Sequence, residues 1–202
     1  MTNGTVVGGL QTPVTAWSHA IVAGAMYLAA LDSNNKGLDY EQAAVSYAAH
    51  NALQWVFHGT RNYNPIDTAY STVLATINLN KNDADAAQKS GAKAAHQVIE
   101  ARTDDGMNDF VPYEVNTNNT IGVYVSTSPT QPVPDDLQAP YVELFFIKGS
   151  VKDFRAPPPP STSSNEYEAF VTQVKGIGAS QSSTRTEDET NIALFWRESS
   201  IM

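Results

Sequence analysis

Apolar positions recur with helical spacing through most of the first hundred residues. Residues 12–31 begin with a proline at the second position and are apolar on all sides from residue 20 onward. That pattern is typical of a helix surrounded by other helices. The segment 33–37 reads SNNKG and predicts a turn. A second helix is then expected from Asp39 to about Phe57, with Asp39 and Gln42 as a capping box.

The second predicted helix carries polar side chains at every fourth position, which places them on one face. This polar ribbon consists of Gln42, Ser46, His50, Gln54 and His58. The apolar residues Val45, Ala49, Ala52 and Val56 fall on other faces. The helix is therefore predicted to be amphipathic.

Two more helices are expected before residue 104. Asn64 and Pro65 are an N-cap and a first helical residue, and apolar residues keep helical spacing from there to residue 77. The next helix should begin at Asn82 or Asp83 and reach about Arg102. One of its faces holds only small residues and a valine, which predicts a close approach of another helix: Ala84, Ala87, Gly91, Ala95 and Val98.

Helical periodicity is lost from residue 104 to about 140, where Asn, Thr, Ser, Pro and Gly dominate. The apolar segment 142–147 fits either a strand or a buried extended segment. An extended proline run, 157–160, follows. Helices are then expected after Ser163 or Ser164, ending near 176–178, and after a capping box of Thr186 and Glu189.

These elements predict an all-α protein: a helical bundle with a long irregular loop and a proline-rich linker. We expect a helical bundle at 1–103, a long loop and linker that pack on it at 104–163, and two further helices at 164–202. Together they should form one structural domain. The last helix has a stripe of apolar residues that includes Trp196. We expect this stripe to need a partner surface that covers it.

Composition excludes several classes of function. The 202 residues carry a formal net charge of −9, which argues against a nucleic acid partner. The chain has no cysteine, so disulfides and thiolate chemistry are excluded. The most apolar run, 20–31, is too short to span a membrane and follows no basic region of a signal peptide. We therefore expect no membrane span, and the lack of a signal peptide favours the cytoplasm.

Basic and acidic residues offer two candidate sites around the irregular region. Lys148 and Arg155 are separated by six residues and followed by Pro157, which nearly forms an anion-binding motif, but Ala156 intervenes. We interpret both as solvated charges on a linker. Asp104 and Asp105 precede Gly106 and could form an acid pair or a metal loop. A helix end with glycine at positive φ is the simpler interpretation, because no later Glu completes a calcium loop.

The remaining candidates also have structural interpretations. His50 and His58 lie two helical turns apart, whereas a metal pair on a helix prefers a spacing of four. His19 and His96 are expected to be packing or surface residues. Asp83 and Asp85 are expected to be charges in the first turn of a helix. Gly176 and Gly178 form a Gly-x-Gly that lacks the preceding strand of a nucleotide site.

Three segments occur together in one order. Residues 91–106 read GAKAAHQVIEARTDDG, 154–160 read FRAPPPP, and 184–196 read TRTEDETNIALFW. In this combination the chain resembles the amino-terminal half of vanadium-dependent haloperoxidase-like proteins, a family related to type 2 phosphatidic acid phosphatases. The likeness extends from about residue 39 to residue 196.

The resemblance implies an all-helical layer packed against a carboxy-terminal half that holds vanadate, with peroxide-dependent halide oxidation as the activity of the complete protein. In that family a Lys and an Arg six residues apart before proline, a Ser-Gly-His segment, and an Arg followed after five residues by a His hold the vanadate. This chain lacks the last two elements, because none of its four histidines follows Ser-Gly or stands six positions after an arginine.

We therefore expect no catalytic, cofactor-binding or metal-binding residue in this chain, and vanadate only in the complete family member. The expected partner is the missing carboxy-terminal half or a second chain, and association of identical copies is a further option. One alternative is a stand-alone helical interaction protein that uses the Trp196 end or the long loop. Another is an independent hydrolase that uses Asp104, Asp105 or His50.

Overall fold

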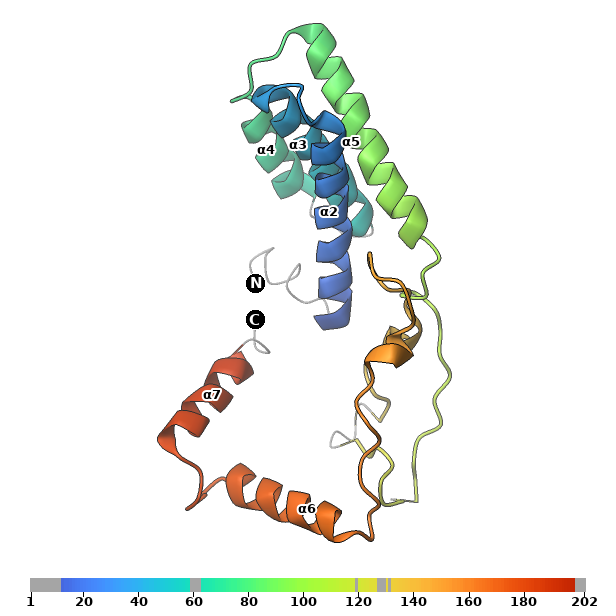
Figure 1. Cartoon of the computed structure of the whole chain (residues 1–202), viewed down its shortest axis with the longest axis vertical. Helices are drawn as coiled ribbons and strands as arrows, with labels where there is room; N and C mark the ends of the chain where they lie inside the picture. The colour runs from blue at the N-terminus through green and yellow to red at the C-terminus, as the bar shows by residue number, and fades with distance from the viewer. Residues whose placement is uncertain (1–11, 59–62, 119, 127–129, 131, 199–202) are drawn as a thin grey trace. The chain divides into compact units, whose positions relative to one another are not determined.

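A computed structural model describes residues 12–58, 63–118, 120–126, 130 and 132–198. Within these ranges the chain is helical and contains no strand, which confirms the predicted all-α class (Figure 1). Segment 142–147, which fitted a strand or an extended segment, is irregular. The helices are α2 Thr12–Ser33, α3 Leu38–Val56, α4 Tyr63–Leu74, α5 Lys81–Arg102, α6 Asn165–Gly178 and α7 Glu187–Glu198, with 3-10 helices η1 Ala139–Tyr141 and η2 Val151–Phe154.

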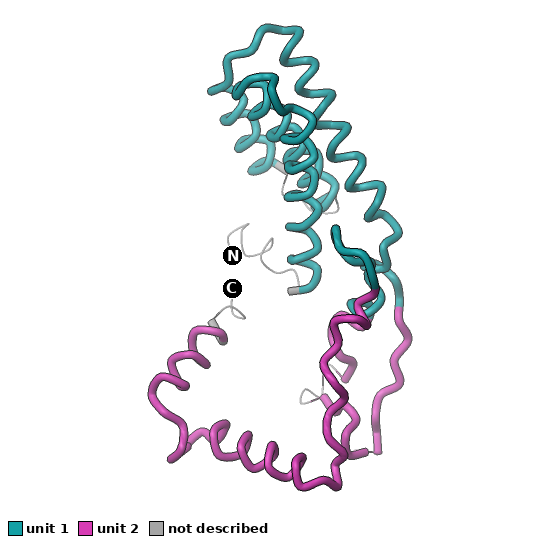
Figure 2. Tube along the Cα trace, in the orientation of Figure 1, with its two compact units in different colours: residues 1–110, 138–149 teal, residues 111–137, 150–202 magenta. Residues whose placement is uncertain are grey.

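The described chain divides into two compact units (Figure 2). Unit 1 holds α2 to α5 and also the later segment 138–149, whereas unit 2 holds 111–137 and the chain from Ser150 onward. These limits differ from the boundaries expected at 103 and 163. The irregular region is shared between the units, because 138–149 belongs to the unit of the first helices and 111–137 belongs to the other unit.

Helices α2, α3 and α5 pack against one another and form the core of unit 1. The core is built mainly of alanine. On α3 the buried residues are Tyr40, Ala43, Ala44, Ala48 and Ala52. Of the apolar residues expected away from the polar ribbon, Ala52 is therefore buried, whereas Val45, Ala49 and Val56 are only half-buried. Small side chains bring helix axes close together, and the fold of this unit depends on that proximity.

Gly91 marks the closest approach between α5 and α3. A Cβ atom at this position would lie 2.6 Å from Tyr47 Cβ and 2.9 Å from the backbone nitrogen of Ala48, and would also meet the Ala44 carbonyl. Ala87, Ala94 and Ala95 are buried beside it. The predicted tight pairing through the small face of α5 is therefore confirmed, with α3 as its partner.

Helix α2 is not enclosed on all sides, contrary to the prediction. Trp17, Ile21, Ala25 and Ala29 are buried in the core, but Tyr27 is 61% exposed, as are large parts of Met26 and Leu31. By length and composition alone, Pro13–Ser33 also fits a membrane-spanning helix or a signal sequence, and 33% of its apolar 18-residue window is buried. The helices α3 and α5 therefore cover only one side of α2.

Several helix ends differ from their sequence signals. Gly37 is the N-cap of α3, so the proposed capping box of Asp39 and Gln42 does not form. Helix α4 begins before Pro65 and ends at Leu74 rather than Ile77. Asn80 caps α5 through a hydrogen bond from the Asp83 backbone, so the helix begins at Lys81, one or two residues earlier than expected. In each case the sequence predicted the right helix and misplaced its end.

Candidate functional sites

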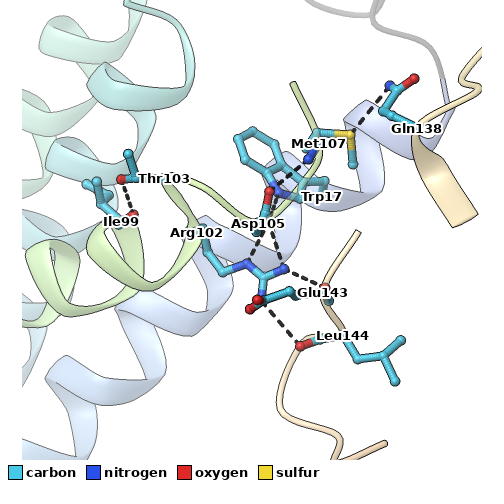
Figure 3. A network of polar contacts seen from close by, with 9 residues as sticks. All are labelled: Trp17, Ile99, Arg102, Thr103, Asp105, Met107, Gln138, Glu143 and Leu144. Atoms are coloured by element: carbon cyan, nitrogen blue, oxygen red, sulfur yellow. Dashed lines mark hydrogen bonds and ion pairs between the residues drawn. The ribbon is translucent and has the colours of Figure 1, made fainter. Parts of the chain in front are cut away.

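A buried ion pair joins the end of α5 to the start of α2 and to the segment 143–145 (Figure 3). Asp105 and Arg102 are 3% and 7% exposed. Asp105 Oδ2 accepts hydrogen bonds from Arg102 Nε at 2.8 Å and from Trp17 Nε1 at 2.6 Å, and Arg102 Nη2 lies 2.7 Å away. Asp105 Oδ1 accepts the Met107 backbone N–H at 3.0 Å. The carboxylate is therefore fully occupied by donors from three parts of unit 1.

Arg102 also holds the segment that follows the long loop. Its guanidinium donates to the carbonyls of Glu143 and Leu144, and it lies 4.0 Å from the centre of the Phe145 ring. The Glu143 backbone N–H donates to the Asp105 carbonyl at 2.9 Å. A planar guanidinium can serve several acceptors in one plane, so a single side chain fixes this segment against α5.

The neighbouring glycine has the conformation expected of it. Gly106 has φ of 92°, which favours glycine, as predicted. Helix α5 nevertheless ends four residues earlier, at Arg102 with Thr103 as its C-cap, so Gly106 belongs to the turn that follows the helix and does not cap it. Asp104 is exposed, whereas Asp105 is buried. The two carboxylates therefore do not form an acid pair, and Asp105 is a structural residue because every donor around it is part of the fold.

A second polar cluster lies between α3 and α4. His50 Nε2 is 2.7 Å from Asp67 Oδ1, which also accepts from Gln54 Nε2 at 3.2 Å. The His50 ring stacks on Tyr70, with centroids 4.0 Å apart, and Tyr47 meets the Tyr70 ring edge-on at 5.4 Å. The polar ribbon of α3 is thus covered in part by α4 instead of facing solvent.

Tyr70 is constrained from two sides in this cluster. Burial and a hydrogen bond with Tyr47 raise the pKa of Tyr70 well above its usual range, so its hydroxyl stays protonated. Next to it, a groove of about 180 Å³ is lined by positions 46, 49, 50 and 53 of α3 and 66, 69, 70 and 73 of α4. No sequence pattern indicates Asp67 as a partner of His50, because the two residues are 17 positions apart on different helices.

A cavity of about 300 Å³ lies between α2 and α5 and includes Asp32, Ser90 and Lys93 in its lining. Ser90 Oγ donates to Asp32 Oδ2 at 2.6 Å. This hydrogen bond lowers the pKa of Asp32, and the positive charge of Lys93 adds to the effect. A carboxylate of lowered pKa is a weak base, so the pair does not activate Ser90 as a nucleophile.

The other histidines are not brought together. His58 Nδ1 lies 2.6 Å from the Trp55 carbonyl at the end of α3. His96 is 3.5 Å from Glu100 on the exposed side of α5, and His19 is exposed on α2. His50 and His58 therefore have different partners and do not form a metal pair.

The basic candidates of the linker belong to different units. Lys148 lies in unit 1 and Arg155 in unit 2, and both are exposed. Between them, Ser150 and Asp153 form a capping box that begins η2. The acidic candidates of α5 are also surface residues, since Asp83 exchanges hydrogen bonds with the cap Asn80 and Asp85 is exposed.

The side chain of Arg185 caps the C-terminal end of α6 in unit 2. Arg185 Nη1 donates to the carbonyls of Ile177 at 2.6 Å and Ala179 at 2.9 Å, and its Nε donates to Thr190 in α7 at 3.1 Å. Neither Gly176 nor Gly178 has a positive φ. Helix α6 thus ends near the predicted glycines, but a cationic side chain satisfies its last carbonyls.

Among the described residues, no group of three or more His, Cys, Asp or Glu side chains is arranged to hold a metal ion. Comparison with known proteins finds no matching family model, no matching curated protein and no matching solved structure. The class that the structure defines is an all-helical protein with an alanine-rich three-helix core.

Proposed function

We propose that this chain is the amino-terminal helical part of a vanadium-dependent haloperoxidase-like protein. Its role there is architectural: it provides a helical layer on which the vanadate-holding helices pack. The resemblance of segments 91–106, 154–160 and 184–196 motivates the proposal. The observation that carries it is the exposure of apolar side chains on α6 and α7.

Both helices of unit 2 are amphipathic, yet α6 contains no buried residue. On α6, Phe170 is 49% and Val174 is 70% exposed, and on α7 Ile192 is 51% and Phe195 is 70% exposed. Within unit 2, α6 and α7 do not pack along each other. Contiguous apolar patches on soluble domains mark interaction surfaces, so a protein surface is the natural cover for these faces.

Two of the segments that carry the resemblance have structural roles in this chain. The first contains Arg102 and Asp105, which fasten 143–145 to α5. The last contains Arg185, which closes α6 and reaches α7. These arginines already serve acceptors of the fold, which favours an architectural role over direct anion binding.

The hydrolase alternative loses Asp105, which is buried and occupied by donors of the fold. Its other residues do not meet, because Asp104 follows α5 and is exposed, whereas His50 pairs with Asp67 between α3 and α4. A stand-alone interaction protein remains the second candidate, because the same apolar faces of α6 and α7 could bind any protein partner with a complementary apolar surface.

Reconstitution tests the proposal. The chain is expressed with the carboxy-terminal half of a vanadium-dependent haloperoxidase that carries the Ser-Gly-His and Arg-x5-His segments. We expect the two to co-purify and to brominate monochlorodimedone with peroxide and vanadate, while the chain alone stays inactive. Bromination by the chain alone would show that it holds a complete site and would refute the architectural role.

A matched pair of variants locates the contact. Phe195→Glu places a charge on the exposed face of α7 and should abolish co-purification, whereas Phe154→Glu, at a 64% exposed phenylalanine of η2, should not. Equal effects of the two variants would exclude this face as the contact. A chain that stays monomeric by light scattering and binds no such half would contradict the proposal.

A further inference from the structure

The groove between α3 and α4 has a regular geometry, and the proposed function assigns it no role. Its walls come from the same spacing on both helices, i, i+3, i+4 and i+7, as in two helices packed side by side. Ala49 and Ala69 occupy the middle positions of the two sets. Two small side chains facing one groove leave a space of about 180 Å³.

The groove is mostly apolar. Leu53, Ile66 and Val73 line it together with the two alanines, and His50 and Tyr70 contribute aromatic rings. Val73 is 44% exposed, so the groove is open to solvent on the α4 side. A dry apolar cavity of about 150 Å³ accepts benzene. The space here therefore fits one substituted benzene ring.

The side chain of His50, which lines the groove, is held in place by two neighbouring residues. Asp67 and the stack on Tyr70 fix the imidazole of His50, whose side chain is 14% exposed. When Nε2–H donates to Asp67, a neutral imidazole presents Nδ1 as an acceptor. Binding sites of this kind combine an apolar lining with few polar groups of fixed orientation.

We propose that this groove binds a small, uncharged aromatic molecule that carries one hydroxyl group. The ring occupies the space between Ala49 and Ala69, and the hydroxyl donates to His50 Nδ1. The net charge of −9 disfavours an anionic ligand. The hydroxyls of Ser46 and Tyr70, which also line the groove, already bond to the Gln42 carbonyl and to Tyr47, so His50 Nδ1 is the acceptor assigned to the hydroxyl of the ligand. This proposal is independent of the proposed function.

The test uses 4-methylphenol as the probe, titrated into the full chain and followed by amide NMR shifts. We expect saturable shifts confined to α3 and α4 with a dissociation constant on the order of 1 mM, which is ordinary for a ligand of this size. Toluene, which lacks the hydroxyl, should bind about fivefold more weakly, the effect of one hydrogen bond.

Two variants and a control complete the design. Ala69→Leu fills the groove and should weaken 4-methylphenol binding by about tenfold or more. His50→Phe keeps an aromatic ring on Tyr70 and should bring 4-methylphenol down to the affinity of toluene. Ala86→Leu, at an exposed alanine of α5, should change neither affinity.

Three results would overturn the proposal. The first is the absence of saturable shifts in the wild-type chain. The second is an equal affinity in Ala69→Leu and Ala86→Leu. The third is a set of groove shifts that depend on protein concentration and not on the probe, which would make a second copy of the chain the occupant.

Discussion

Replacing Asp105 by Asn removes one charge from the buried ion pair while it keeps the shape of the side chain. In the wild type, Asp105 Oδ2 faces three donor nitrogens, from Arg102 and Trp17. The side-chain amide of asparagine has an NH2 group in place of one carboxylate oxygen. This NH2 group then faces at least one N–H donor of the site. Arg102, which is 7% exposed, then loses the carboxylate of its buried ion pair.

The size of the effect follows from burial. Breaking a buried ion pair by removing one partner costs about 3 to 5 kcal/mol. Arg102 keeps the carbonyls of Glu143 and Leu144 as acceptors, which places the expected loss near the lower limit, about 3 kcal/mol. Because small domains are stable by only about 5 to 15 kcal/mol, this loss is a large share of the total.

Urea denaturation followed by circular dichroism at 222 nm measures the loss, with Asp104→Asn as the matched control. Asp104 is the adjacent exposed carboxylate, so its replacement should change the free energy of unfolding by less than about 0.5 kcal/mol. Hydrogen exchange of the Glu143 amide, which donates to the Asp105 carbonyl, should also accelerate in Asp105→Asn alone. Equal midpoints for the two variants would refute the argument that the ion pair fastens 143–145 to α5.

Two further predictions concern helix packing and helix capping. Gly91→Ala should destabilise the chain by about 1 to 3 kcal/mol, because the new Cβ would lie 2.6 Å from Tyr47 Cβ; Gly178→Ala, which meets nothing within 4 Å, is the control in the same urea assay. Hydrogen bonds from the Thr186 backbone and hydroxyl lower the pKa of Glu189, so its stabilisation of α7 is present above the pKa of the unfolded chain and is lost as the pH falls through the lowered pKa. Thr186→Ala should move the pKa of Glu189 upward in a carboxyl NMR titration.

For each of these two predictions, one experimental result would contradict it. A Gly91→Ala chain as stable as the Gly178→Ala control would mean that α3 and α5 can separate at no cost. A pKa of Glu189 that is unchanged in Thr186→Ala would show that the hydroxyl contributes nothing to the cap.

The sequence by itself determined the elements of this protein. Helical spacing of apolar residues located the helices, because a side chain's face depends only on its position along the helix. The small face of α5 predicted a close partner, since only small residues allow backbones to approach. Capping signals at Ser164 and at Thr186 with Glu189 also held, because they act within one turn.

Only the tertiary structure decided which residues meet. The pairing of His50 with Asp67 joins two helices, and the contacts of Arg102 span more than forty residues of an irregular loop. The exposed side of α2 likewise depends on how many helices cover it, and its own composition is apolar all round. The physical reason is the same in each case: local spacing fixes the face on which a side chain lies, and packing alone fixes what that face contacts.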